Sequence, residues 1–246
     1  MMTSLRRRRH QNGPRNAGVV LLHGIAGRSL MLRPLEKRLQ LAGFATLNLD
    51  YESRKKPLEQ LAEDIHPAIA EFAAGIDGPI HFVTHSMGGL LARVTIAKHR
   101  PPRLGRVVML GTPNGGSEIA DRLQNVGLYR TYFGPAGLQL VTTKHDTLAA
   151  LPPADYEIGV IAGNRFLDPI SGLFLLPWPN DGRVSVESCK LAEMTDSTVI
   201  KASHMGLLVH PASFRQTIAF LRDGQFEPAR PLLRGVIAEI GRRAAS

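Results

Sequence analysis

The chain has 246 residues, of which 43% are hydrophobic and 21% are charged. This composition suits a globular domain with a sizeable core, and the single cysteine, Cys189, excludes an internal disulfide framework and a cysteine-based metal cluster. No apolar run approaches the roughly 18–20 residues that a membrane-spanning helix needs.

The net charge of +9 lies mostly at the start of the chain. Residues 1–15 contain Arg6–Arg9 and Arg15 and no acidic residue, which accounts for more than half of the excess. No apolar segment follows these arginines, so they do not have the pattern of an export signal. We expect residues 1–17 to form a basic, disordered leader with at most a weak attraction to an anionic membrane surface, and we expect a cytoplasmic protein.

The first 110 residues alternate short apolar runs with segments whose apolar residues recur every three or four positions. The runs predict strands and the segments between them predict helices. Strands are expected at Gly18–Leu22, Phe44–Leu49, Ile80–Thr84 and Arg106–Leu110, and helices from a cap at Ser29 to Ala42, from Pro57 to about Phe72 with a kink at Pro67, and from about Met87 to Lys98. Such alternation favours a parallel sheet that is covered on both faces.

After Thr112 this rhythm breaks. Residues 113–153 are rich in glycine, proline and polar residues, and we interpret them as a lid-like insertion. Further strands are expected at Glu157–Ala162 and near Ser197–Lys201, and a helix near Pro211–Leu221. The main domain would then span residues 18–225, followed by a helical extension over residues 226–246. The apolar run Leu173–Trp178 is a candidate lining for an acyl pocket, or else a buried connection.

The strongest local signal is the sequence Thr84-His85-Ser86-Met87-Gly88, between a predicted strand and a predicted helix. A serine on such a sharp turn is exposed at the carboxyl end of the sheet, and the residues two positions on either side of it must be small. Gly88 meets this requirement, whereas Thr84 stands where glycine is usual. Ser86 is therefore a candidate nucleophile, and the alternative is that it only caps the following helix.

A second candidate element is the turn His23–Gly27, directly after the first predicted strand. Parallel strands end at the same edge of a sheet, so this turn would lie near Ser86 if the two strands are neighbours. The N–H groups of Ile25 and Met87 could then stabilise the oxyanion of a tetrahedral intermediate. The alternative is an ordinary connection between a strand and a helix.

Together with three later segments, these motifs resemble the α/β-hydrolase superfamily and, more narrowly, its lipases and esterases. The resembling segments come in the order that the family uses: Leu21–Gly27, Thr84–Gly89, Leu110–Glu118, Pro179–Ser188 and Ser203–Leu208. They span about residues 18–222. The resemblance implies an α/β fold in a minimal form, with about six mostly parallel strands, helices on both faces and the lid-like insertion after the fourth strand.

In that family the nucleophile comes first along the chain, then the acid and then the histidine. The resemblance therefore implies Ser86 as nucleophile, Asp181 as acid and His204 as base. Asp168 is a rival acid because it lies nearer the end of the preceding strand, but the Asn-Asp-Gly-x-Val pattern around Asp181 is the one that the resemblance supplies. His85 adjoins the nucleophile, but we expect its side chain to point away from Ser86.

The resemblance implies a serine hydrolase that cleaves carboxylic esters, with an acyl or lipid-like substrate, through an acyl-enzyme. A thioesterase, an amidase or an acyltransferase would use the same residues, and a non-catalytic binding protein of this fold is a further alternative. No metal ion or organic cofactor is implied. We expect no nucleic-acid partner, because the sequence lacks a glycine-rich phosphate loop with lysine, zinc-ligand spacing and aromatic residues interleaved on a basic face.

Overall fold

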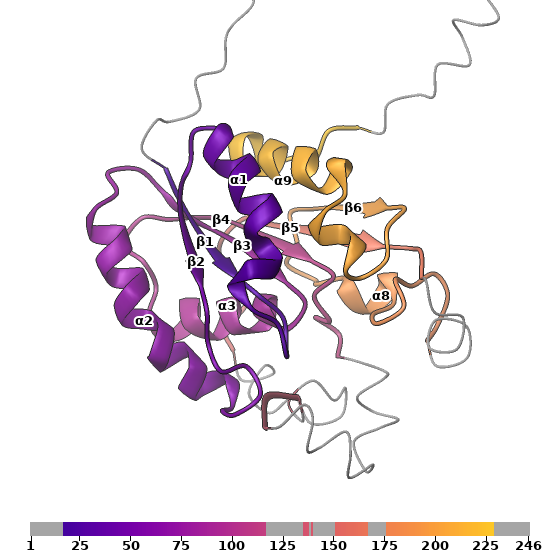
Figure 1. The fold of residues 1–246 in the computed structure, drawn as a ribbon, viewed down its shortest axis with the longest axis horizontal. Coiled ribbons are helices and arrows are strands. Elements are labelled where there is room, and N and C mark those ends of the chain that lie inside the picture. Colours follow the sequence, from indigo (N-terminus) through magenta and orange to yellow (C-terminus); the bar gives the residue numbers. More distant parts are fainter. Residues whose placement is uncertain (1–16, 117–134, 138, 140–150, 167–175, 229–246) are drawn as a thin grey trace, which may run out of the picture.

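The computed structural model describes residues 17–116, 135–137, 139, 151–166 and 176–228. Within these residues six strands form one sheet in the order β2-β1-β3-β4-β5-β6 (Figure 1). The strands are β1 (Gly18–Leu22), β2 (Ala45–Leu49), β3 (Ile80–His85), β4 (Leu104–Leu110), β5 (Ile158–Gly163) and β6 (Asp196–Ile200). Every neighbouring pair is parallel, which confirms the expected α/β sheet.

Helices cover both faces of the sheet, as the alternation in the sequence predicts (Figure 1). α2 (Leu58–Ala74), α3 (Met87–Lys98) and the short α8 (Val186–Cys189) pack on one face, and α1 (Arg33–Leu41) and α9 (Pro211–Asp223) pack on the other. Successive residues of a strand point to opposite faces, so each strand contributes to two cores. In β1, for example, Val20 and Leu22 belong to the first core and Val19 and Leu21 to the second.

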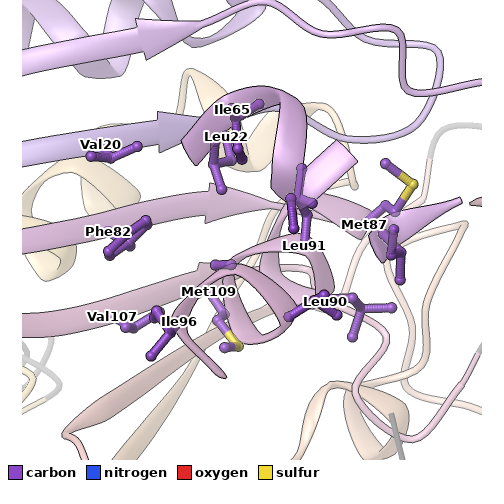
Figure 2. Close-up of a cluster of buried hydrophobic side chains, with 14 of the residues drawn as sticks. Val20, Leu22, Ile65, Phe82, Met87, Leu90, Leu91, Ile96, Val107 and Met109 are labelled. Atoms are coloured by element: carbon purple, nitrogen blue, oxygen red, sulfur yellow. The ribbon is translucent and has the colours of Figure 1, made fainter. Parts of the chain in front are cut away.

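The core under α2 and α3 holds the start of α3 in place. Figure 2 shows buried side chains of three neighbouring strands, among them Phe82 and Val107, gathered with Ile65 of α2 and Leu91 of α3. α3 is buried at most of its positions, which is typical of a helix that is apolar all round. Its first turn, beginning at Met87, therefore has little freedom to move relative to the sheet.

The first helix begins differently from the prediction. Ser29 does not cap an α-helix but opens a 3-10 turn, η1 (Ser29–Leu32), that precedes α1. Its hydroxyl donates to one oxygen of Asp50 at 2.8 Å and its N–H donates to the other at 2.7 Å. The side chain that would cap the helix is therefore used to bind the loop after β2, a contact that helix periodicity does not reveal.

The end of α1 explains why β2 starts one residue later than predicted. Gly43 adopts a positive φ of 94°, and the N–H of Phe44 turns back to the carbonyl of Leu39 at 3.1 Å. This pairing satisfies a carbonyl at the end of the helix, as glycine-terminated helices commonly do. Phe44 thus belongs to the helix end, while α2 continues through Pro67 without interruption.

The strand order creates a topological switch point at the carboxyl edge of the sheet. β1 lies between β2 and β3, and the connection from β1 to β2 runs through α1 on one face, whereas α3 follows β3 on the other. The helices that follow β1 and β3 therefore lie on opposite faces of the sheet, although the two strands are neighbours. Such a point is where open α/β sheets bind ligands, and it lies between His23–Gly27 and Ser86.

Several expectations fall wholly or largely outside the described residues: the leader up to residue 16, most of the lid-like insertion and the tail from residue 229. The described parts of the insertion form hydrogen bonds to α2 and α8, on the same face of the sheet. Gly115 N–H donates to the Ser188 carbonyl at 2.9 Å, and the side-chain oxygen of Gln139 accepts from Leu58 N–H at 2.8 Å.

His81 of β3 occupies a position where the ladder with β4 shifts register. Its Nδ1 atom accepts the N–H of Arg106 at 2.8 Å, and a Cβ on Gly105 would lie 2.5 Å from the same nitrogen. Burial, more than the nearby Arg106 charge, lowers the pKa of His81 to about 4. The folded protein therefore holds this ring neutral.

Acid should destabilise the protein through His81. Between pH 6.5 and about 4 the unfolded chain binds a proton that the folded chain does not, so stability falls as the pH falls through this range, by up to about 3 kcal/mol. In His81→Asn the amide oxygen can still accept from Arg106 but does not titrate, so urea unfolding should depend less on pH. His210→Asn is the control, because His210 accepts a similar bond from Ala212 N–H at 3.1 Å but is partly exposed. Equal pH dependence of His81→Asn and the unchanged protein would contradict the prediction.

Candidate active site

Ser86 lies on the sharp turn between β3 and α3. Its backbone has φ 55° and ψ −130°, and Ser86 and Ala26 are the two non-glycine residues with positive φ among those that the structure describes. Such conformations cost on the order of 1–3 kcal/mol and persist where the surroundings hold them. Ser86 N–H donates to the Leu110 carbonyl at 2.9 Å. The hydroxyl makes no capping hydrogen bond to α3, so the geometry gives the capping interpretation no support.

The turn requires the small residue that the sequence supplies after the serine. A Cβ on Gly88 would lie 2.4 Å from the Leu22 carbonyl oxygen and 2.7 Å from that of His23. Thr84, which stands where glycine is usual before the serine, is fully buried in β3 and its hydroxyl reaches the Val108 carbonyl at 3.3 Å. The threonine is accommodated because its polar group is satisfied by the neighbouring strand.

The structure brings His204 and Asp181 together in a buried pair. His204 Nδ1 lies 2.8 Å from Asp181 Oδ2, and the Asp181 side chain is wholly inaccessible to solvent. The other carboxylate oxygen, Oδ1, accepts the N–H groups of Arg183 at 2.9 Å and Val184 at 2.8 Å, and His204 N–H donates to the Asp181 carbonyl at 2.9 Å. Each polar atom of this carboxylate thus has a partner, as a buried charge requires.

The tight turn around Asp181 and the ends of two strands make room for this pair. Gly182 has a positive φ of 92°, which a residue with a side chain adopts only with strain. A Cβ on Gly111, just after β4, would lie 3.1 Å from His204 Nδ1, and one on Gly163, the last residue of β5, would lie 2.8 Å from the Asp181 Cβ. The absence of side chains at these two strand ends lets the imidazole and the carboxylate lie against the sheet.

The pair lies beside the turn that carries Ser86. Ser86 N–H binds the carbonyl of Leu110, and the next residue, Gly111, lies against the His204 ring. Among the described residues no hydrogen bond joins the Ser86 hydroxyl to His204. Catalytic hydrogen bonds are often long or poorly aligned before substrate binds. Because His204 Nδ1 faces the carboxylate, Nε2 is the nitrogen left to exchange a proton with a neighbouring group.

Two backbone N–H groups beside Ser86 are left without an acceptor among the residues that the structure describes. Within the described part of the chain, neither Ile25 N–H nor Met87 N–H has a hydrogen-bond acceptor. A Cβ on Gly24 would lie 2.9 Å from the Ser86 Cβ, so the turn after β1 touches the serine directly. Met87 is the first residue of α3, whose N-terminus favours negative charge.

Sequence reasoning missed a contact of His85. The His85 side chain contacts His204. Its Nε2 atom lies 3.1 Å from the His204 carbonyl oxygen, and the centroids of the two rings are 4.5 Å apart. Burial, and then the neighbouring His204, hold the pKa of His85 well below its usual value. A neutral Nε2–H donor therefore supports the backbone of His204. No sequence pattern links these residues, which lie 119 positions apart.

Two further candidates lie wholly or partly outside the described residues. Asp168 lies outside the described residues, as do residues 173–175 of the apolar run before Asp181. Trp178, at the end of that run, is 67% exposed and meets Phe166 edge to face. In the part of the chain that the structure describes, no group of three or more His, Cys, Asp or Glu side chains could hold a metal ion, and none of its helices combines the length and apolar character needed to cross a bilayer.

Comparison with known families matches residues 19–139 to a family described as the alpha/beta hydrolase fold. The chain has the α/β-hydrolase fold. The parallel six-stranded sheet with its helices on both faces agrees with this assignment. No match was found among curated protein sequences.

Solved structures similar to this α/β-hydrolase-fold protein include a lipase, a carboxyl esterase and a thioesterase. The mature Bacillus licheniformis lipase BlEst2 has a TM-score of 0.72 at 20% identity, covering 85% of this chain and 93% of the lipase. The metagenomic carboxyl esterase MGS0156 has a TM-score of 0.60 at 18% identity, covering 91% and 70%. The RedJ thioesterase of Streptomyces coelicolor has a TM-score of 0.52 at 18% identity, covering 83% and 89%. These likenesses establish the shared fold.

Proposed function

We propose that the protein is a serine hydrolase of carboxylic esters, with Ser86 as nucleophile, His204 as base and Asp181 as acid. The observation that carries this proposal is the buried bond of 2.8 Å between His204 Nδ1 and Asp181 Oδ2, placed beside a serine on a strained strand-to-helix turn. A carboxylate in this position fixes the tautomer of the imidazole and stabilises the imidazolium that forms during catalysis. The similarity to a lipase and a carboxyl esterase supports the substrate class.

In the proposed reaction His204 Nε2 takes the proton of the Ser86 hydroxyl while the oxygen attacks the acyl carbonyl carbon. The carbonyl oxygen becomes an oxyanion, which the N–H groups of Ile25 and Met87 stabilise. His204 then gives its proton to the leaving alkoxide, and the acyl group stays bound to Ser86. Water, losing a proton to His204, attacks the acyl carbon, and Ser86 regains its proton as the acid is released. Each step uses groups of this chain and water.

The experiment that tests this proposal is covalent labelling by a fluorophosphonate, which reacts with an activated serine. We expect labelling of the intact protein, with the modified peptide containing Ser86, and no labelling of Ser86→Ala. Ser213→Ala is a matched control, because Ser213 is a fully buried serine whose hydroxyl has no partner within the described structure. An unlabelled folded protein, or equal labelling of Ser86→Ala, would reject the assignment and favour a non-catalytic binding protein of this fold.

The substrate class needs a separate test, because the similarity also extends to a thioesterase. Esters, thioesters and amides with matched acyl chains would rank the three reactions by kcat/KM, and an added alcohol would reveal acyl transfer. We propose that an acyl or lipid-like ester is the substrate with the highest kcat/KM. The basic leader joins β1 at Gly18, at the edge of the sheet opposite Ser86, so we propose that any attraction to an anionic membrane modifies binding and does not form the site.

A further inference from the structure

The turn after β1, which would supply one oxyanion donor, is bound by the loop that follows β2. Ala26 N–H donates to the hydroxyl oxygen of Ser53 at 3.0 Å, and Ser53 is buried although it belongs to a surface loop. Ala26 has a φ of 56°, a conformation that a residue with a side chain rarely adopts. The Ser53 oxygen therefore accepts a hydrogen bond from the strained residue that follows Ile25.

The carbonyl before Ile25 is also fixed. The oxygen of Gly24 lies 2.8 Å from His23 Nδ1 and accepts Gly27 N–H at 3.0 Å. In a planar trans peptide the C=O and N–H bonds point in opposite directions. The Gly24 oxygen is held on the side of Gly27, so Ile25 N–H points to the other side of the turn. The Gly24 Cα lies against Ser86.

Ser53 is itself held by Tyr51, which packs on the same turn. Ser53 N–H donates to the Tyr51 carbonyl at 2.9 Å, and the Tyr51 ring stacks on the His23 ring with centroids 4.0 Å apart. The Tyr51 hydroxyl donates to the His23 carbonyl, and burial lowers the pKa of His23, which keeps the ring neutral. The two loops are thus connected at the His23 ring, the His23 carbonyl and the Ala26 amide.

These bonds matter because the turn borders a pocket on its outer side. A pocket of about 600 Å³ lies there, lined by Ala26, Gly27, Arg28 and residues 50–55. Side chains that packed tightly against the turn would hold its shape by contact. Here the turn borders the pocket, so hydrogen bonds, including those to Ser53 and Tyr51, contribute more to its shape.

We propose that Ser53 is a positioning residue, which holds the strained turn at Ala26 in the conformation that directs Ile25 N–H toward the reacting carbonyl at Ser86. Tyr51 assists by fixing the Ser53 loop and the His23 carbonyl. This inference rests on the proposed function. Ser53 makes no hydrogen bond to Ser86 and acts on Ile25 N–H through Ala26, so its removal should weaken stabilisation of the oxyanion while leaving substrate binding nearly unchanged.

The test compares Ser53→Ala with Ser53→Thr, which keeps the hydroxyl, and with Ser29→Ala. The Ser29 hydroxyl binds Asp50 at the start of the same loop but makes no hydrogen bond to residues 23–27. We expect Ser53→Ala to lower kcat by about 10- to 100-fold, somewhat less than the loss of a whole oxyanion donor, with KM changed by less than about threefold. Affinity for an aryl boronic acid, whose tetrahedral adduct places an oxygen in the same position, should fall by a similar factor. Ser53→Thr should recover most of the kcat, and Ser29→Ala should stay near the unchanged protein.

Two outcomes would overturn the inference. In the first, Ser53→Ala folds and is labelled at Ser86, but its kcat and its affinity for the boronic acid are unchanged. The proposed function would then stand, and the positioning role of Ser53 would be rejected. The other is an equal loss in Ser53→Thr, since the hydroxyl would then not be the cause. If Ser53→Ala does not fold, Tyr51→Phe removes the bond to the His23 carbonyl and keeps the stacked ring, and it should lower kcat in the same selective way. An intact protein that does not label at Ser86 would reject the proposed function itself.

Discussion

Asp181→Asn should lower kcat for ester hydrolysis by about 10⁴-fold while the protein remains folded. The asparagine oxygen can still accept the N–H groups of Arg183 and Val184, which bind Asp181 Oδ1 at 2.9 and 2.8 Å. The amide nitrogen would then face His204 Nδ1, where the carboxylate now lies at 2.8 Å. Because that nitrogen is a donor, His204 would have to carry its proton on Nε2 and could no longer take the proton of Ser86.

The measurement is kcat and KM on a soluble ester, together with the thermal unfolding midpoint. KM should change little, because the carboxylate is inaccessible to solvent and its Oδ2 atom faces the imidazole. Asp196→Asn is the matched control: Asp196 accepts the N–H groups of Ser197 at 2.7 Å and Phe226 at 2.8 Å, at the start of β6 and far along the strand from His204. The kcat of Asp196→Asn should stay within about twofold of the kcat of the unchanged protein.

Asp168→Asn completes this series, because Asp168 is the rival acid. A large loss in Asp168→Asn with little loss in Asp181→Asn would move the role of the acid to Asp168 and leave the bond at Asp181 with a structural role only. The reverse result would support the assignment made from the buried pair. The two variants change the same chemical group, so their difference reports position rather than charge.

The strands and the ends of strands could be predicted because a buried strand requires a run of apolar residues in the sequence. A parallel strand covered on both faces is a continuous apolar run, and β1 has the bounds that Gly18–Leu22 predicts. The turns that follow such runs must lie at one edge of the sheet. The proximity of His23–Gly27 to Ser86 was therefore within reach of sequence reasoning, and so was the need for glycine at position 88.

The contacts that shape the site could not be predicted in this way. Ser53 and Ala26 lie 27 positions apart, and the His85 ring meets the carbonyl of His204 across 119 positions. Hydrophobic periodicity describes which side of an element is buried, but these bonds are made by polar atoms of loops and of a strand end, and those atoms follow no such period. Ser29 shows the same limit, since a good capping residue is used instead by Asp50, which lies 21 positions away.

The pairing of His204 with Asp181 lies between these two cases. Spacing alone left Asp168 and Asp181 open, and the resemblance favoured Asp181 through Asn180 and Gly182. The geometry supplies a physical reason for both neighbours. Asn180 Oδ1 accepts Gly182 N–H at 3.0 Å, and Gly182 takes the positive φ that turns the chain back toward the sheet. The motif therefore encodes a turn that presents a carboxylate, while its partner depends on the fold.

Gly88→Ala should be the most destabilising of the substitutions considered, at about 3 kcal/mol or more of unfolding free energy. The added Cβ would lie 2.4 Å from the Leu22 carbonyl oxygen and 2.7 Å from that of His23. Both are backbone atoms, and Leu22 is paired on both sides, with Leu49 of β2 and Thr84 of β3. Neither the strand nor the buried helix α3 can move away without losing hydrogen bonds or core contacts.

Urea unfolding of Gly88→Ala and Gly75→Ala would measure this effect against a suitable control. Gly75 follows α2 with φ −87°, and the nearest atom to an added Cβ is the Phe72 carbonyl oxygen at 3.6 Å. Alanine there should be neutral or slightly stabilising, because it restricts the unfolded chain. A similar urea midpoint for both variants would show that α3 is not pressed against the end of β1.

The same contact connects stability to catalysis. Gly88 touches the carbonyls that precede Gly24, and Met87, which carries the second proposed oxyanion donor, lies one residue before it. A Cβ at position 88 would push the first turn of α3 away from the turn after β1, and the N–H groups of Ile25 and Met87 would separate. Gly88→Ala that still folds should therefore lose kcat as well as stability, because the distance between the two donors depends on a residue with no side chain.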